Sequence, residues 1–386
     1  MDVKSQVVLV HCDQYDEKLV KQAVERGIDL LGGISKFISP QENILLKPNV
    51  LVGVPPEKCV STHPSVLKAV AECCLHAGAK VSVGDSPGFG KPVAALKKAG
   101  LVAVAESLGL MLADFETGKT VSFPEGSLQK QFTIAKGVLE ADGLISLSKL
   151  KTHGLTKITG AIKNQFGCIP GILKGEFHAK LPNVNFFSHM LVDLTRFLKP
   201  RLYIMDGIIA MEGNGPRGGT PKPMKVLLFS ADPAALDATF CRLIGVEPQQ
   251  VFTLQWAEKL GLGTYREDQI ELLGDPFASL QDLQFDVKRE MTPGEQRLGL
   301  PPWLSRLTTS LLSPRPVIAP PRCARCGTCV HICPVTPKAV DFHNGDRAQP
   351  PTYKYSRCIR CYCCQEICPE SAISIKVPFL GRLIRR

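Results

Sequence analysis

Two copies of one cysteine pattern, CARCGTCVHICP (323–334) and CIRCYCCQEICP (358–369), decide the fold of the C-terminal part of this chain. Each copy has the spacing C-x2-C-x2-C-x3-C-P. Three closely spaced cysteines on one tight loop can hold three corners of a [4Fe–4S] cubane, and the fourth begins a segment that crosses to the other cluster. The duplicated pattern therefore predicts two [4Fe–4S] clusters that join the two halves of one module.

The crossing gives each cluster three cysteines from one copy and one from the other. We expect one cluster on Cys323, Cys326, Cys329 and Cys368, and the other on Cys333, Cys358, Cys361 and Cys364. Zinc is the alternative metal, but two quartets that both end in Cys-Pro disfavour it. We expect Cys363, an additional thiol, to pack as a bystander. The pattern resembles the bacterial two-cluster ferredoxin over the whole module, which implies a one-electron relay.

Length and composition indicate a multidomain protein with no transmembrane segment. The 386 residues suit two or three domains. No run of about eighteen apolar residues occurs, and the apolar run at the N-terminus is too short for a secretory signal. Nine of the fifteen cysteines lie within 323–368, where reduced thiolates binding metal are favoured over disulfides. We therefore expect a cytoplasmic protein.

The charge of the chain limits the kinds of partner that we expect. A net charge of +10 is moderate, there is no long basic run, and aromatic residues make up only 6% of the chain, so nucleic acid is not expected. A small anionic substrate and an acidic redox partner protein, such as a ferredoxin, explain the positive charge at least as well.

Residues 1–290 alternate apolar runs with amphipathic stretches, which predicts a layered α/β body. Helices are expected at 17–31 and 64–78. Strands are expected at 6–10, 43–47, 80–85, 143–148, 202–207 and 225–230. The fold class is thus an α/β body with a small C-terminal ferredoxin-like (α+β) two-cluster module at 322–377.

Two further segments flank this module. Seven prolines punctuate residues 291–321, which predicts a semi-rigid linker with a short amphipathic piece at 303–312. The basic tail, 378–386, is expected to dock onto the body or a partner, and weak contact with a membrane surface stays open as the alternative.

Polar residues follow several of the predicted strands, where ligands collect in open α/β sheets. These candidates for substrate binding are Lys47 and Asn49 after the second strand, and Asp85 and Ser86 after the third. The fourth strand is followed by SKLKTHGLTKITGAIKNQFGCIPG (148–171), which contains four lysines and no acidic residue. This segment predicts an anion site, with a solvated basic helix face as the alternative.

Individual residues in this region have competing interpretations. His153 is a candidate base or metal ligand, and a structural role is equally open. Cys168 is expected to fill the core. Glu212, in the loop MEGNGPRGG (211–219), is a candidate for proton transfer beside a closely approaching ligand. Asp232 is expected to cap a helix, while Asp237 is not singled out as functional.

The motifs KPN (47–49), THP (62–64), GDSPG (84–88), 148–167, DGIIAMEGNGP (206–216) and ADPAALDATF (231–240) occur in the order of one known family. The body resembles the family catalogued as domain of unknown function 362, which frequently carries a fused two-cluster ferredoxin. The resemblance implies an iron–sulfur protein, often called an oxidoreductase, with no agreed substrate. A similarity to the nickel-dependent lactate racemase class is more distant and is analogy only. The matching residues, which would carry any shared chemistry, are Lys149, Lys151, His153, Lys163, Asn164 and Glu212.

Three functional hypotheses follow from these observations. The first is an oxidoreductase that binds a small anion through lysines 149, 151 and 163 and uses His153 or Glu212 for proton transfer. The second is a carrier or assembly factor that passes electrons or clusters to a partner enzyme. The third is a racemase- or lyase-like metal-dependent enzyme in which the clusters are structural. Neither a dinucleotide-binding glycine motif nor a phosphate-binding loop is present to choose among them.

Overall fold

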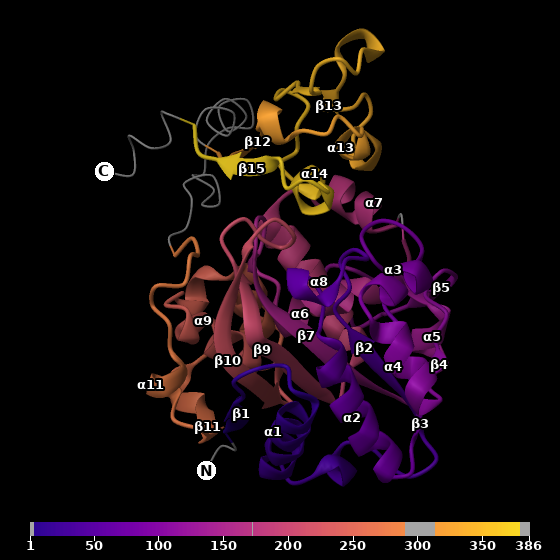
Figure 1. Cartoon of the computed structure of the whole chain (residues 1–386), viewed down its shortest axis with the longest axis vertical. Coiled ribbons are helices and arrows are strands. Elements are labelled where there is room, and N and C mark those ends of the chain that lie inside the picture. The colour runs from indigo at the N-terminus through magenta and orange to yellow at the C-terminus, as the bar shows by residue number, and fades with distance from the viewer. Residues whose placement is uncertain (1–3, 172, 290–312, 379–386) are drawn as a thin grey trace.

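The computed structural model describes residues 4–171, 173–289 and 313–378. A large α/β body forms most of the molecule, and the small cysteine-rich module lies at one end of it, with α14 (Cys363–Ile367) of the module beside α7 (Leu173–Lys180) of the body (Figure 1). The expected fold class, an α/β body with a small C-terminal module, is confirmed.

A mixed sheet runs through the body. In spatial order its strands are β11 (Ile270–Gly274), β1 (Ser5–His11), β10 (Thr220–Ser230), β9 (Leu202–Glu212), β7 (Gly143–His153), β2 (Asn43–Pro48), β3 (Lys80–Val83) and β4 (Met111–Leu112). Strand β10 is antiparallel to both of its neighbours, and the other pairs in this order are parallel. A hairpin of β5 (Gly118–Ser122) and β6 (Gln131–Ala135) lies outside this sheet.

Helices cover both faces of the sheet because the strands are buried on both sides. Consecutive residues of β1 alternate between the two cores, with Val7 in one and Val8 in the other. One face carries α1 (Glu17–Leu30), α2 (Pro64–His76), α3 (Pro92–Lys98) and α4 (Leu101–Leu108). The other face carries α6 (Gly160–Asn164), α8 (Val184–Leu198), α9 (Pro233–Leu243) and α10 (Phe252–Lys259). The short helices α5 (Lys136–Leu139), α7 (Leu173–Lys180) and α11 (Phe277–Leu280) complete the body.

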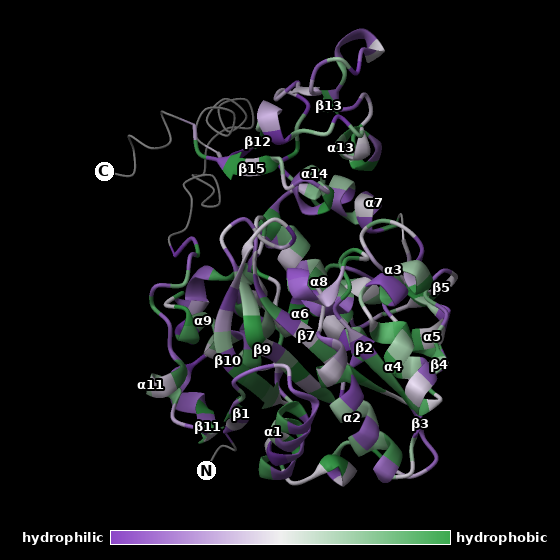
Figure 2. Ribbon diagram, in the orientation of Figure 1, coloured by the Kyte–Doolittle hydropathy of each residue, from purple (hydrophilic) through white to green (hydrophobic). Residues whose placement is uncertain are grey.

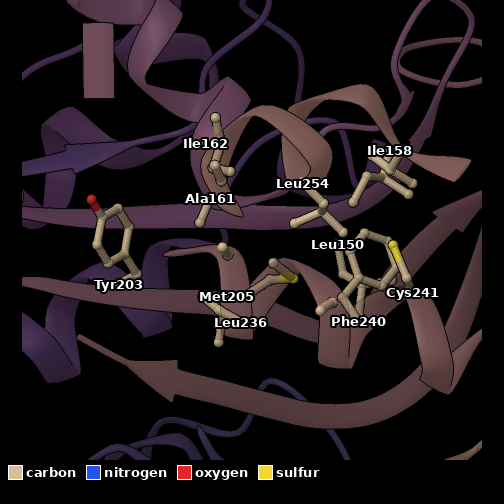
Figure 3. Close-up of a cluster of buried hydrophobic side chains, with 14 of the residues drawn as sticks. Leu150, Ile158, Ala161, Ile162, Tyr203, Met205, Leu236, Phe240, Cys241 and Leu254 are labelled. Carbon is tan, nitrogen blue, oxygen red and sulfur yellow. The ribbon is translucent and has the colours of Figure 1, made fainter. Parts of the chain in front are cut away.

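The core on the face that carries α6, α8, α9 and α10 fixes the position of α6, the helix that contains Lys163. Figure 3 shows Ala161 and Ile162 of α6 in one cluster with Leu150 of β7 and Phe240 of α9. Figure 2 shows the strands in the middle of the sheet as mostly hydrophobic and α1 as alternating in colour, which is typical of an amphipathic helix. Burial of this apolar surface is the main stabilisation of the layered body.

The predicted helices end close to their predicted bounds. Helix α1 begins after Asp16, whose carboxylate accepts hydrogen bonds from the backbone N–H groups of Lys18 and Leu19. The N-cap role of Asp232 is confirmed, since its carboxylate accepts from the first turn of α9. Side-chain oxygens at N-caps satisfy N–H groups that have no partner inside the helix.

Strands β7 and β9 run past their predicted ends, and β10 begins at Thr220, before its predicted start at 225. Strand β7 was expected at 143–148 but continues to His153, and β9 was expected at 202–207 but continues to Glu212. The extension of β7 is possible because β9 and β8 (Lys157–Ile158) pair with its end. Lysines 149 and 151 and His153 therefore lie on a buried strand rather than on a loop after it.

The module consists of two small β-pairs and two short helices that carry cysteines. Strand β12 (Arg315–Ile318) pairs with β15 (Ile373–Lys376), β13 (Val340–Asp341) pairs with β14 (Thr352–Tyr353), and the helices are α13 (Thr328–Ile332) and α14 (Cys363–Ile367). Strand β12 falls inside the predicted linker, because it pairs with the last strand of the module. The amphipathic piece at 303–312 and residues 379–386 of the tail lie outside the described residues.

Polar contacts join the module to the body. The Gln365 side chain of α14 donates to the backbone carbonyls of Asn214 and Gly215, at 3.0 and 3.1 Å. The Asn214 side chain donates back to the carbonyl of Ile373, at 3.0 Å. Arg217 donates to the carbonyl of Ile367. The glycine-rich loop after β9 thus serves as a docking site for the module.

Candidate active site between the body and the cysteine module

The structure brings together the four cysteines that the spacing assigns to the first cluster. One small cavity is lined by Cys323, Cys326, Cys329 and Cys368, which are three cysteines of the first copy and the last of the second. Cys333, Cys358 and Cys364 pack into the core of the module. Four thiol side chains around one cavity, three of them from a tight loop, fit a [4Fe–4S] cubane.

A larger cavity, of about 760 Å³, lies between the body and the module. Its volume falls within the roughly 300–1,000 Å³ that is usual for small-molecule sites. The body contributes the segments after β2 and β3, the end of β7, and helices α6 and α7. The module contributes residues of α13 and α14 and the cysteine Cys333. The lining includes Asn49, Asp85, Ser86, Lys151, His153, Lys163, Asn164, Lys174, His178, Cys333, Cys363 and Glu366.

His153 lies at the junction of the two parts. Its Nδ1 accepts hydrogen bonds from the backbone N–H groups of Leu155 and Thr156, at 3.0 and 3.3 Å. The ring proton must therefore be on Nε2, which lies 3.1 Å from Oε1 of Glu366. Burial, reinforced by Lys163, lowers the pKa of His153 to about 4. The imidazole is consequently neutral near pH 7.

Glu366 of α14 is the acidic residue opposite His153. Burial alone would raise the pKa of its carboxyl group, but His153 and Lys163 bring the pKa below its ordinary value. Its Oε1 and the His153 Nε2 are buried, and neither has a partner with hydrogen-bond geometry among the described residues. This carboxylate is therefore ionised and open to a further donor.

The cavity lining contains five lysines. Lys180 pairs with Glu176 at 3.3 Å and Lys338 donates to the carbonyl of His331 at 3.3 Å, and the other three differ in how their ammonium groups are satisfied. Lys151 donates to the carbonyl of Val60 at 2.6 Å. Lys174 donates to the hydroxyl and the carbonyl of Ser86, at 2.7 and 3.1 Å, and to the carbonyl of Ile169 at 2.8 Å. Lys163 has no hydrogen bond or ion pair to any described residue, and its Nζ lies 5.9 Å from the centroid of the Phe166 ring. Lys163 is thus the cavity lysine whose charge is available to a ligand.

Burial disfavours the charged form of Lys151, Lys163 and Lys174. It lowers the pKa of Lys174 to about 7, and it lowers the pKa of Lys163 and, more strongly, that of Lys151. Bringing an anion into the cavity favours the charged forms. The site is therefore built so that anion binding and lysine protonation support each other.

A buried polar network behind the cavity wall fixes several predicted residues. The Lys47 ammonium lies 2.7 Å from the Asp85 carboxylate and donates to Oδ1 of Asn164 at 3.1 Å. Burial raises the pKa of Asp85 despite this ammonium. The Asn49 side chain donates to the same Asn164 oxygen at 3.2 Å. This network orients Asn49, Asp85 and Asn164 at the cavity, while Lys47 itself does not line it.

Two predicted site residues lie elsewhere. Lys149 is buried in a network in which its ammonium donates to Asp206 at 2.8 Å and to the Tyr15 hydroxyl at 2.6 Å. Glu212 accepts a hydrogen bond from the backbone N–H of Asp286 at 2.8 Å. Neither residue lines the cavity. Cys168 is fully buried in an apolar cluster, where burial raises its pKa to about 12.

Sequence reasoning missed several cavity residues. Lys174 and His178 stand four residues apart on α7, and this spacing puts both on one helix face, which was the available signal. Nothing in the sequence pointed to Glu366, because its role depends on how the module docks. Cys363 was expected to be a bystander, and the structure places it in the cavity lining.

The chain belongs to a recognised class. Its C-terminal part, residues 315–369, matches a 4Fe-4S dicluster domain, so this part is an iron–sulfur domain. Residues 44–242 match the family described as Domain of unknown function (DUF362), and the chain is a member of that family. The fusion that the sequence motifs imply is therefore confirmed.

Two similar proteins add context. The "Thylakoid-associated protein sll1697" of Synechocystis sp. is 34% identical over 261 residues, which cover 67% of this chain and 80% of that protein. The lactate racemase apoprotein from Thermoanaerobacterium thermosaccharolyticum aligns with a TM-score of 0.40 at 14% identity, over 63% of this chain and 57% of that one. Among the described residues, no helix has both the length and the hydrophobicity that crossing a bilayer requires.

Proposed function

We propose that this protein is an iron–sulfur oxidoreductase that binds an organic anion between its body and its module. Two [4Fe–4S] clusters, when bound, would supply one-electron transfer. Cys323, Cys326, Cys329 and Cys368 would hold one, and Cys333, Cys358, Cys361 and Cys364 the other. This proposal favours the first of the three hypotheses over a carrier and over a racemase-like enzyme.

One observation carries the proposal. Cys333, a predicted cluster ligand, lines the same cavity as Lys163 and His153 of the body. A molecule bound in that cavity would therefore lie beside Cys333, a cysteine of the second quartet, with no protein layer between them. Electron transfer to a substrate needs such proximity, whereas a carrier needs no enclosed cavity on the body side.

The side chains of the cavity have distinct proposed tasks. Lys163, with Lys151 and Lys174, attracts the anion. Asn49, Ser86 and Asn164, with Asp85 behind them, position it. His153 holds a proton at Nε2, because two backbone N–H groups occupy its Nδ1. That proton faces the Glu366 carboxylate, so His153 would act as a neutral hydrogen-bond donor toward the ligand.

The proposed entry point for electrons is the first quartet, which consists of Cys323, Cys326, Cys329 and Cys368. Cys326 is exposed, whereas Cys333 and Cys364 are buried. A redox partner protein such as a ferredoxin could approach at Cys326 without reaching the cavity. Lys149 and Glu212 have no task in this proposal, since neither lines the cavity. The cytoplasm remains the proposed location.

The test uses protein purified anaerobically, with iron and acid-labile sulfide in the amounts that two [4Fe–4S] clusters require. The dithionite-reduced protein is mixed with 2-oxo acids and α,β-unsaturated carboxylates, and cluster reoxidation is followed by visible absorbance together with product analysis. We expect reoxidation by one of these acids to be lost in Lys163→Met and retained in Lys136→Met, which changes an exposed lysine outside the cavity lining. Rapid electron transfer to a ferredoxin, with no acid reduced, would favour the carrier hypothesis.

A further inference from the structure

The walls of the cavity divide into a polar end and an apolar end. At the polar end, Lys163, Glu366, His153 and His178 lie close enough to influence one another electrostatically. At the apolar end, Leu51 of the body packs with Ile332 and Ile367 of the module in one cluster. The Phe89 ring extends this apolar wall, edge-on to the His331 ring at 5.9 Å between centroids.

The polar end contains buried atoms that lack partners. Thr159 Oγ1, His178 Nδ1 and Asn49 Oδ1 are buried in the cavity lining and have no hydrogen bond to any described residue. Buried polar atoms are nearly always satisfied in native proteins, so a ligand or ordered water must complete them. These atoms share the cavity lining with the Lys163 ammonium, which has no hydrogen bond or ion pair to a described residue.

The cavity as a whole contains far more space than a small acid would fill. A simple carboxylate held at Lys163 would leave most of the roughly 760 Å³ occupied by water against Leu51, Phe89 and Ile367. Water against apolar side chains is unfavourable, and an apolar group that displaces it gains affinity. Size and wall chemistry therefore favour a ligand with a ring or a branched chain.

We propose that the cavity takes an amphipathic carboxylate, with its acidic group at Lys163 and an apolar ring or chain against Leu51, Phe89, Ile332 and Ile367. A carboxylate fits better than a phosphate ester, because the cavity lining contains lysines but no arginine among the described residues, and Arg forks are favoured for bidentate phosphate recognition. This inference rests on the proposed anion site and names its ligand class.

Binding is measured by anaerobic calorimetry on the cluster-loaded full chain, without any electron transfer. The probes are 2-naphthylacetate, its amide 2-naphthylacetamide, acetate, and 2-naphthylmethylphosphonate. We expect 2-naphthylacetate to bind at least about tenfold more tightly than each of the others, which is the factor that one charge-assisted contact or one buried ring supplies.

Two variants separate the ends of the cavity. Lys163→Met should weaken 2-naphthylacetate about tenfold and leave the amide unchanged, while Leu51→Ala should weaken the acid and the amide equally. Lys136→Met is the control and should bind as the wild type does. Equal binding of acid, amide and acetate, or preference for the phosphonate, would overturn the proposal. Because no electrons move in this experiment, the proposed redox function can fail while the ligand class stands, and the reverse also holds.

Discussion

Two lysines of the same basic segment have opposite environments. Lys149, on β7, is 1% exposed and donates to both Asp206 and Tyr15. Lys163, at the end of α6, is half-buried and has no hydrogen bond or ion pair to a described residue. The charge of Lys149 is compensated within the fold, whereas the charge of Lys163 is left for a ligand. Residue type and motif membership alone do not distinguish a structural from a binding role.

The difference comes from the backbone that carries each residue. Lys149 and Asp206 are direct neighbours in the parallel pairing of β7 and β9, so the sheet register itself forms the ion pair. Tyr15 completes the network, and burial raises its pKa well above the usual range, so its hydroxyl stays protonated. Lys163 instead lies on α6, outside the sheet, and lines the cavity between the body and the module. The sheet register provides Lys149 with an ion-pair partner, whereas the cavity between the body and the module provides none for Lys163 among the described residues.

Removing Asp206 should produce the largest effect on stability. Asp206→Ala leaves the Lys149 ammonium buried without its carboxylate, and breaking a buried pair from one side costs about 3–5 kcal/mol. Chemical denaturation followed by circular dichroism should show this loss in the free energy of unfolding. The double variant Asp206→Ala/Lys149→Met removes the stranded charge and should recover part of the loss. A single variant as stable as the wild type would contradict the role assigned to this pair.

The next effect concerns Asp237, the carboxylate beneath α6. It accepts hydrogen bonds from the backbone N–H groups of Ala161 and Ile162, at 2.5 and 3.1 Å, and no cation pairs with it among the described residues. Burial raises its pKa from 3.8 to about 7. This carboxyl group therefore has a pH-dependent charge near neutrality.

The sign of this pH dependence follows from proton binding. Because the folded pKa lies above the unfolded one, the stabilising contribution is full below about pH 4 and is lost as the pH rises through about 7. Asp237→Asn keeps an acceptor for the α6 N–H groups and removes the titration. Relative to the wild type, the variant should gain stability as the pH rises from about 5 to about 8. Chemical denaturation at pH values roughly one unit apart measures this gain. A pH-independent difference between the two proteins would show that Asp237 does not titrate in this range.

The sequence identified features that depend on local spacing and missed those that depend on docking. The cysteine repeat predicted the crossed quartet, and the apolar runs predicted the helices and strands of the body, because both signals are short-range. Strand β7 was predicted to stop at Ser148, since the polar residues after it look like a loop. Only the partners Asp206, Val60 and Glu366, all distant in the sequence, make a buried strand of Lys149, Lys151 and His153 acceptable.

A smaller effect is expected when Lys163 itself is changed. Lys163→Met removes a half-buried cation that has no hydrogen bond or ion pair to a described residue, so the free energy of unfolding should change by less than about 1 kcal/mol or should rise. The same denaturation series used for Asp206→Ala provides the measurement. A loss as large as that of Asp206→Ala would mean that Lys163 is structural, and the comparison between the two lysines would fail.

The smallest effect is expected at Lys136, which serves as the matched control for Lys163. Its ammonium lies 3.5 Å from Glu140, and both side chains are more than half exposed, at 61% and 59%. Solvent screens such a pair, so its loss leaves stability nearly unchanged. Lys136→Met should match the wild type in denaturation midpoint, while Lys163→Met should match it in midpoint only and lose ligand affinity. Both variants change the net charge equally, so a difference between them in binding reflects position in the cavity and not overall charge.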